Sequence, residues 1–147
     1  MTHGALNHLA VTVTDLAASE ARFYAPVLGF LGYEKVEDIP GTMTLWVNMP
    51  AQMAMNLWQA KPEVAGKKHA LYAPGFHHCA FGVDRRDDVE AVHALLQEKG
   101  IPILDPPADY PQYGEGYYAV FFEDPDGLKY EVVHLPLFSP EVGRQPG

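Results

Sequence analysis

The sequence predicts an α+β protein made of two copies of one βαβββ unit. A strand-like run around His8 returns 70 positions later around His78, with Ala and then Val at the same spacings after each histidine. Each run is followed by a helical pattern and then by three strand-like segments. Tight turns join these later strands, so the sheets are expected to be mostly antiparallel.

The first helix is expected directly after the first strand. Asp15 is a suitable N-cap, and apolar residues recur after it at helical spacing. Pro26 weakens the last turn of this helix, and Gly29 is expected to end it. The three strands that follow are expected at about residues 33–39, 42–48 and 53–59.

The second unit repeats this order. Asp87 and Glu90 form a capping-box pattern at the start of its helix, and Gly100 with Pro102 is expected to end it. The buried face of this helix is expected to contain Val89, Val92 and Leu96. The strands after it are expected at about residues 101–105, 117–123 and 128–134.

The whole chain, residues 1–147, is expected to form one domain. Its parts are expected to be a first unit at 6–60, a linker at 61–75, a second unit at 76–135 and a C-terminal tail at 136–147. A second irregular segment, 105–116, is rich in tyrosine and proline. It is interpreted either as a lid over a pocket or as a surface strap packed by its own aromatic rings.

The composition excludes several classes of function. With 19 acidic and 10 basic residues, the formal net charge of −9 argues against nucleic acid or an anionic membrane as a partner. The longest stretch without charged residues or histidine, 39–60, contains two prolines and is typical of strands rather than of a membrane helix. Cys79 is the single cysteine, so no internal disulfide can form. We therefore expect a cytoplasmic protein.

Together these features resemble the vicinal oxygen chelate superfamily, which includes glyoxalase I, extradiol dioxygenases and bleomycin-resistance proteins. The segments that carry the resemblance are His8–Leu16, Phe23–Tyr24, Leu28–Phe30, His78–Phe81 and Asp124–Glu131. The resemblance implies a glyoxalase-like fold, in which the two curled sheets form a cup around a divalent metal ion. It is specific for the fold and does not choose among the reactions.

The resemblance also implies which residues bind the metal. The ligands of such proteins come from the first and last strands of each unit, which here gives His8, His78 and Glu131. Asn56 occupies the fourth position. Two imidazoles and one carboxylate with open positions favour Fe(II) or Mn(II), and they also allow Zn(II), Ni(II) or Co(II).

The histidines near these positions are interpreted as structural. His77 and Cys79 flank His78 and are expected on the opposite face of its strand. His134 is expected on the opposite face from Glu131 for the same reason. These residues are therefore left out of the predicted ligand set.

Asn56 bears most directly on the type of reaction. The family's proton-transfer enzymes carry Glu or Gln at this position, and an Asn side chain cannot act as a base. An extradiol-type dioxygenase is therefore slightly favoured over a glyoxalase-type lyase or isomerase. Tyr113 and Tyr118 are candidate catalytic residues, and Asn56 and Tyr117 are candidate substrate-binding residues. Simple aromatic packing is an equally good interpretation of the three tyrosines.

Two other functions stay open. One is a metal-free protein that binds a small molecule, as bleomycin-resistance proteins do, although the predicted ligand set argues against it. The other is a degenerate family member with a structural or regulatory role, which Asn56 leaves open. The resemblance further implies a homodimer, with the cup built within one chain or by exchange of units between two chains.

Overall fold

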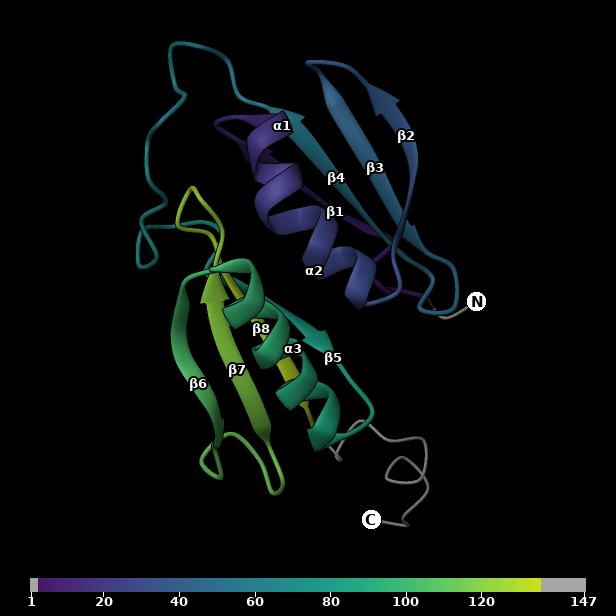
Figure 1. The fold of residues 1–147 in the computed structure, drawn as a ribbon, viewed down its shortest axis with the longest axis vertical. Coiled ribbons are helices and arrows are strands. Elements are labelled where there is room, and N and C mark those ends of the chain that lie inside the picture. The colour runs from purple at the N-terminus through teal and green to yellow at the C-terminus, as the bar shows by residue number, and fades with distance from the viewer. Residues whose placement is uncertain (1–2, 136–147) are drawn as a thin grey trace. The chain divides into compact units, whose positions relative to one another are not determined.

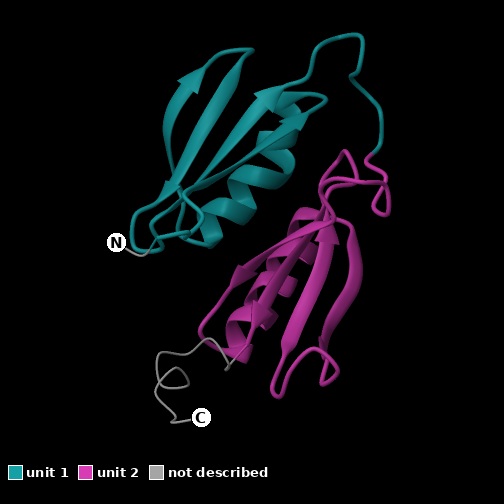
Figure 2. Cartoon of the chain, turned by 180° about the vertical axis from the view of Figure 1, so that it is seen from behind, with its two compact units in different colours: residues 1–68 teal, residues 69–147 magenta. Residues whose placement is uncertain are grey.

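The computed structural model describes residues 3–135. It shows an α+β protein with two four-stranded mixed sheets, which confirms the predicted fold class. The chain divides into two compact units, residues 1–68 and 69–147, which Figure 2 colours separately. The boundary between the units lies within the predicted linker, whereas the predicted C-terminal tail lies outside the described residues.

Unit 1 has a helical stretch over one face of its sheet (Figure 1). Its elements are β1 (His8–Val13), α1 (Leu16–Ser19), a π-helical segment (Glu20–Tyr24), α2 (Ala25–Phe30), β2 (Glu34–Ile39), β3 (Met43–Asn48) and β4 (Met53–Gln59). The strand order is β1-β4-β3-β2. The pairing of β1 with β4 is parallel and the other two pairings are antiparallel, so the sheet is mostly antiparallel as expected.

The start of the first helix is as predicted, but its end is not. The Asp15 carboxylate accepts a hydrogen bond from the N–H of Ala18 at 3.0 Å, which confirms the N-cap. Gly29 lies inside α2, and the residue with left-handed φ after the helix is Gly32, at 87°. Pro26 follows the π-helical segment, in which the N–H of Ala25 donates to the carbonyl five residues back. This wider turn relieves the clash that a proline ring makes with the preceding helical turn.

Unit 2 repeats the same order of elements. They are β5 (His78–Gly82), α3 (Arg86–Lys99), β6 (Ile103–Asp109), β7 (Tyr118–Glu123) and β8 (Lys129–His134). The strand order β5-β8-β7-β6 matches that of unit 1, with β5 parallel to β8. Figure 1 shows α3 lying across one face of this sheet.

The predicted capping box of α3 is wrong by two residues. Arg85 is the N-cap, and its N–H donates to the carboxylate of Asp88 at 3.0 Å. Asp87 lies in the first turn, and Glu90 accepts a hydrogen bond from Tyr118 instead. The end of the helix is as predicted, because Gly100 has a left-handed φ of 65°. The predicted apolar face is confirmed, since Val89, Val92 and Leu96 are all buried.

The segment predicted to be irregular, 105–116, is partly a strand. β6 extends to Asp109 in spite of Pro106 and Pro107. The register with β7 passes directly from Asp105 to Ala108, so the two prolines fall in an irregularity. Proline is tolerated there because β6 is an edge strand. Only the residues between β6 and β7 form a loop.

The register separates the two faces of the unit 2 sheet. Val120 pairs with Val132 and Phe122 with Tyr130, and all four side chains are buried on the face that α3 covers. Phe121, Glu131 and Ala80 form a row on the other face, because residues paired across neighbouring strands share a face. We call this second surface the open face of unit 2.

Unit 1 has an equivalent open face. Its corresponding row is Leu45, Asn56 and Ala10. Asn56 and Glu131 therefore occupy the same register position in the two units, as His8 and His78 do. Within residues 3–135, no helix is long and apolar enough to cross a membrane.

Candidate functional site

The centre of the candidate site is the carboxylate of Glu131. The residue lies on β8 and is only 1% exposed. A carboxylate in such a place needs hydrogen-bonding or charged partners, since burying it alone costs several kcal/mol. The Tyr117 hydroxyl donates to one of its oxygens, and Nε2 of His78 lies 3.2 Å from the other. Both oxygens are therefore engaged by side chains of the open face.

His78 is held at both of its ring nitrogens. It is the first residue of β5, and its Nε2 points to Glu131. Its Nδ1 lies 2.7 Å from Nδ1 of His77, and the two rings meet edge to face with centroids 4.9 Å apart. The ring of Tyr72 in turn lies at 5.4 Å from that of His77. The imidazole of His78 is thus fixed between a carboxylate and a second imidazole.

The expectation that His77 faces away from His78 is wrong. Side chains alternate only within a strand, and β5 begins at His78, so His77 is free of that alternation. The expectation holds for the other two neighbours. Cys79 pairs with Tyr130 on the face covered by α3, and burial raises the pKa of its thiol to about 11. His134 pairs with Tyr118 on the same covered face.

His8 in unit 1 has a matching arrangement. It is the first residue of β1 and is exposed. Its Nδ1 lies 2.9 Å from the side-chain oxygen of Asn7, the residue just before the strand. Asn7 corresponds to His77 in the repeat, so each unit uses the residue before its first strand to hold the histidine that begins it. An amide oxygen can only accept, and therefore Nδ1 of His8 carries the hydrogen in this bond.

Three tyrosines pack together beside Glu131. The rings of Tyr110, Tyr113 and Tyr117 lie within 5.5–6.3 Å of one another, and Tyr110 also meets Phe121 at 5.4 Å. The loop is closed by a hydrogen bond from the N–H of Tyr110 to the carbonyl of Tyr117. This geometry favours a strap packed by its own rings over an open lid. Desolvation, together with the bond to Glu131, raises the pKa of the Tyr117 hydroxyl.

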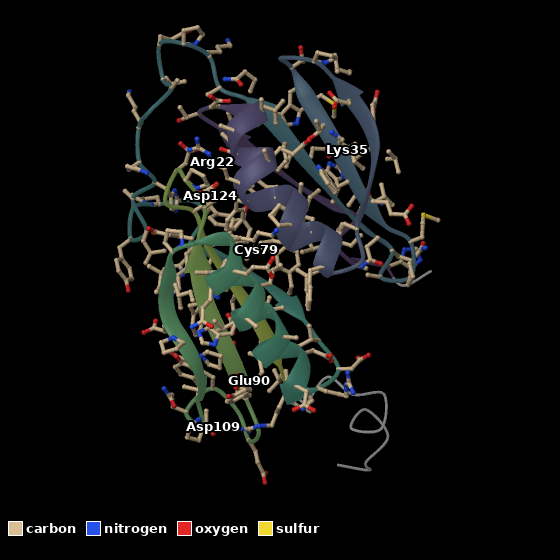
Figure 3. The ribbon with its side chains drawn as sticks, in the orientation of Figure 1. Arg22, Lys35, Cys79, Glu90, Asp109 and Asp124 are labelled. Atoms are coloured by element: carbon tan, nitrogen blue, oxygen red, sulfur yellow. The ribbon has the colours of Figure 1, made fainter. Side chains whose placement is uncertain are left out.

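Tyr113 and Tyr118 lie in different surroundings. Tyr113 is 61% exposed and belongs to the tyrosine cluster. Tyr118 lies on the covered face, where its hydroxyl donates to Glu90 and its ring lies 3.9 Å beneath the guanidinium of Arg86. Arg86 also makes two hydrogen bonds to Asp109, and Figure 3 labels Glu90 and Asp109. Tyr118 thus links α3 to β7 and does not face Glu131.

Other residues near Glu131 on the open face were not singled out by the sequence analysis. The ammonium group of Lys129 lies 4.5 Å from the centre of the Phe121 ring on the open face. Next to it is an apolar surface, formed by the buried residues Ala119, Phe121 and Val133 with the partly buried Tyr110, Tyr117 and Leu135. Lys129 lies next to His78 because β5 and β8 are paired in parallel. This pairing is not visible in the sequence, so the sequence analysis could not place Lys129 near the candidate ligands.

Neither unit by itself contains a complete metal site. Over the described residues, no group of three His, Cys, Asp or Glu side chains is placed to hold a metal ion. Of the predicted ligands, unit 2 carries His78 and Glu131, and unit 1 carries His8 and the half-buried Asn56 at the equivalent positions. A cleft of about 430 Å³ in unit 1 is separate from these residues, since it is lined by Leu16, Glu20, Thr44 and others on the helix side.

Comparison with known proteins identifies the family of the chain. The sequence profile of the Glyoxalase/Bleomycin resistance protein/Dioxygenase superfamily matches residues 5–132. The chain belongs to this superfamily, as the sequence analysis predicts.

Two similar proteins and one solved structure match more than two thirds of this chain. The protein YqjT of Bacillus subtilis is 30% identical over 87% of this chain and 97% of its own. An ethylmalonyl-CoA/methylmalonyl-CoA epimerase of Cereibacter sphaeroides is 28% identical over 69% of this chain and 75% of its own. The crystal structure of lactoylglutathione lyase from Agrobacterium tumefaciens has a TM-score of 0.67 at 25% identity, and it covers 92% of this chain and 97% of its own.

One further solved structure of similar fold contains a divalent metal ion. It is a variant of the fosfomycin resistance protein FosX from Listeria monocytogenes in complex with Mn(II), with a TM-score of 0.64. It covers 89% of this chain and 90% of its own. At 16% identity, this likeness shows the shared fold alone.

Proposed function

We propose that the protein is a metal-dependent enzyme whose small substrate binds through two neighbouring oxygen atoms at a divalent ion held by His8, His78 and Glu131. The observation that carries the proposal is the convergence of His78 Nε2 and Glu131 Oε2, 3.2 Å apart on the open face of unit 2. His8 completes the set, from the same chain or from a second copy in a homodimer.

The residues present fit such an ion. A neutral imidazole nitrogen and a carboxylate oxygen are donors that suit Fe(II) or Mn(II), and also Zn(II), Ni(II) or Co(II). Glu131 is a buried acid whose side-chain partners are one hydroxyl and one imidazole, so a bound cation would offset its negative charge. A divalent ion held by these residues would supply Lewis-acid chemistry, because its positive charge would stabilise negative charge on substrate oxygens.

The hydrogen bonds around the histidines support metal binding through Nε2. Nδ1 of His8 carries a hydrogen because its partner is an amide oxygen, which leaves the lone pair on Nε2. With a metal ion between Nε2 and Glu131, His78 would take the same tautomer, with its Nδ1–H donating to His77. Metal-binding histidines are commonly oriented by a hydrogen bond at the second nitrogen. Tyr117 does the same for the carboxylate of Glu131.

Asn56 limits the types of reaction that the proposed site could catalyse. Because its amide cannot accept a proton, we assign it to substrate binding through hydrogen bonds. Tyr117 keeps its hydrogen at neutral pH, since its pKa is raised, and it acts as a hydrogen-bond donor rather than as a base. Of the three candidate tyrosines, Tyr113 is the most exposed, and we assign it to contact with the substrate. This set favours an extradiol-type dioxygenase slightly over a glyoxalase-type lyase or isomerase.

The apolar surface beside Glu131 favours a second candidate function. A metal-free protein that binds a small aromatic or aliphatic molecule would use the same Phe121, Tyr110 and Tyr117 side chains. Binding of metal decides between the two functions, because the second needs none.

The test is the metal content of tag-free protein purified without chelators, measured by elemental analysis. We expect about one metal ion per chain in the wild type and loss of it in His8→Ala, His78→Ala and Glu131→Gln. His3→Ala is the matched control and should keep its metal, since His3 is exposed and outside the strands. Wild-type protein that takes up no metal, even after reconstitution, would contradict the enzyme and favour the binding protein.

A further inference from the structure

Lys129 is placed beside the proposed metal ligands in an unusual way. It pairs with His78 on β5 and with Glu123 on β7, and all three side chains share the open face. A lysine directly opposite a glutamate on a neighbouring strand commonly forms an ion pair with it, and Glu123 is in that position here. Instead, the ammonium group lies over the ring of Phe121, which is the register partner of Glu131. The lysine therefore leans along the sheet toward the site.

Lys129 brings a positive charge close to the proposed metal ligands. Over residues 3–135, the ion pairs of unit 2 engage Arg85, Arg86, Lys99 and His78, and none engages Lys129. The side chain is partly exposed, so the ammonium remains accessible to a ligand. In a chain of net charge −9, a positive side chain on this face gives an anionic ligand a local electrostatic attraction.

The ring of Phe121 also positions this charge. It contacts the ammonium group at 4.5 Å on one side, and the ring of His78 lies 6.4 Å from it. Phe121 is buried and held by Tyr110, so the platform beneath the lysine is fixed. A cation over an aromatic face is stabilised there without losing its capacity to donate hydrogen bonds.

We propose that Lys129 is a specificity residue that binds an anionic group, most simply a carboxylate, of the substrate. This inference rests on the proposed function and extends it, because it assigns the substrate to the class of small anionic molecules that carry two neighbouring oxygen donors. The lysine binds the negative group while the donor oxygens lie toward His78 and Glu131. Charge-assisted hydrogen bonds of this kind are roughly twice as strong as neutral ones.

The experiment compares ligands that share a chelating group and differ in charge. Catechol and its two carboxylated forms, 2,3- and 3,4-dihydroxybenzoate, are titrated calorimetrically into protein loaded with Mn(II), without oxygen. The quantity measured is the carboxylate preference, which is the Kd of catechol divided by that of each dihydroxybenzoate. Comparing this ratio between variants removes the intrinsic difference in chelating strength between the ligands.

The main variant is Lys129→Met, which keeps the aliphatic contact with Phe121 and removes the charge. We expect the carboxylate preference to fall about tenfold for at least one isomer, which corresponds to about 1.4 kcal/mol. Lys129→Arg should restore it to within about threefold. Lys99→Met is the matched control, since it removes the same charge from the end of α3 and should leave the preference unchanged. Mn(II) affinity should not fall in Lys129→Met, because a neighbouring positive charge is removed.

The outcomes separate this inference from the proposed function. An unchanged preference for both isomers in Lys129→Met would overturn the role of Lys129 while leaving metal binding intact. Ligand binding that is independent of Mn(II) but still favours carboxylates through Lys129 would support the anion site and contradict the enzyme. Wild-type protein that binds none of the three compounds, with or without Mn(II), would contradict both.

Discussion

The two units share one backbone plan and differ in the chemistry placed on it. The row Ala80, Glu131 and Phe121 in unit 2 corresponds to Ala10, Asn56 and Leu45 in unit 1. The position of Lys129 is occupied by Ala54 in unit 1. Unit 2 thus carries a buried acid and a lysine at these positions, whereas unit 1 has neutral residues at both.

The two first-strand histidines are what the units keep in common. His8 and His78 occupy the same register position, and each has its Nδ1 held by the preceding residue. The fold therefore gives the two units equivalent backbone positions, and the sequence places side chains of different charge at those positions. We infer that unit 2 provides the charged ligand and the substrate's anchor, while unit 1 provides one imidazole and one amide.

The largest effect is expected when unit 2 is made like unit 1. Glu131→Asn shortens the side chain and removes the charged ligand, so Mn(II) affinity should fall at least about a hundredfold, or about 2.7 kcal/mol. The converse change, Asn56→Glu, should raise it about tenfold, or about 1.4 kcal/mol, by adding a carboxylate donor. Isothermal titration calorimetry measures both. Equal affinity of Glu131→Asn and the wild type would show that the difference between the units has no bearing on metal binding.

A smaller loss of metal affinity is expected when the residues that hydrogen-bond to the two histidines are replaced. Asn7→Ala and His77→Ala should each lower metal affinity about tenfold, because orienting partners of metal ligands commonly contribute that much. His77→Gln should recover most of the loss, since its amide oxygen can accept from Nδ1 of His78. Titration with Mn(II) gives the affinities. Unaltered binding in both alanine variants would mean that these bonds do not orient the ligands.

Tyr117→Phe should change stability and its pH dependence. Loss of the bond to Glu131 should lower the free energy of unfolding by about 1 kcal/mol at neutral pH. Because the pKa of Tyr117 is raised in the folded protein, its stabilisation is fully present below pH 10 and is lost as the pH rises further. Urea unfolding between pH 7 and 11 should therefore show a steeper alkaline decline in the wild type. Parallel curves for the two proteins would contradict the coupling.

The smallest effect is expected at the neighbouring tyrosine. Tyr118→Phe removes the hydroxyl that donates to Glu90 on the covered face, where the groups are partly exposed. Stability should fall by about 0.5 kcal/mol, and metal affinity should stay within about twofold of the wild type, a difference of about 0.4 kcal/mol. Thermal unfolding and Mn(II) titration of the same sample measure the two. A large loss of metal affinity would place Tyr118 in the site, against its position in the fold.

Much of the fold follows from the sequence because its repeat is explicit. The spacing around His8 and His78 predicts two units, and the last strands of those units place Asn56 and Glu131, which are 75 residues apart in the sequence, at the same register position. Local signals of known chemistry, such as the Asp15 cap and the Gly100 turn, are also correct. These features depend on neighbouring residues and on strand alternation, both of which the sequence displays.

The rest depends on contacts that the sequence does not display. His77 was misplaced because alternation was applied one residue before the strand begins. Alternation places Tyr117 and Tyr118 on opposite faces, but only the register with β8 shows that Tyr117 is the one beside Glu131. The position of Lys129 over Phe121 depends both on the pairing of β7 with β8 and on the direction of the lysine side chain. Neither is available from spacing alone.

The most direct test of the central claim counts the imidazoles on the bound ion. Pulsed electron paramagnetic resonance of Mn(II)-loaded protein detects nitrogen nuclei coordinated to the metal, and labelling histidine with ¹⁵N identifies them as imidazole. Our account predicts two imidazole nitrogens in the wild type and one in each of His8→Ala and His78→Ala. A wild-type spectrum with one coordinated imidazole, unchanged by His8→Ala, would contradict it.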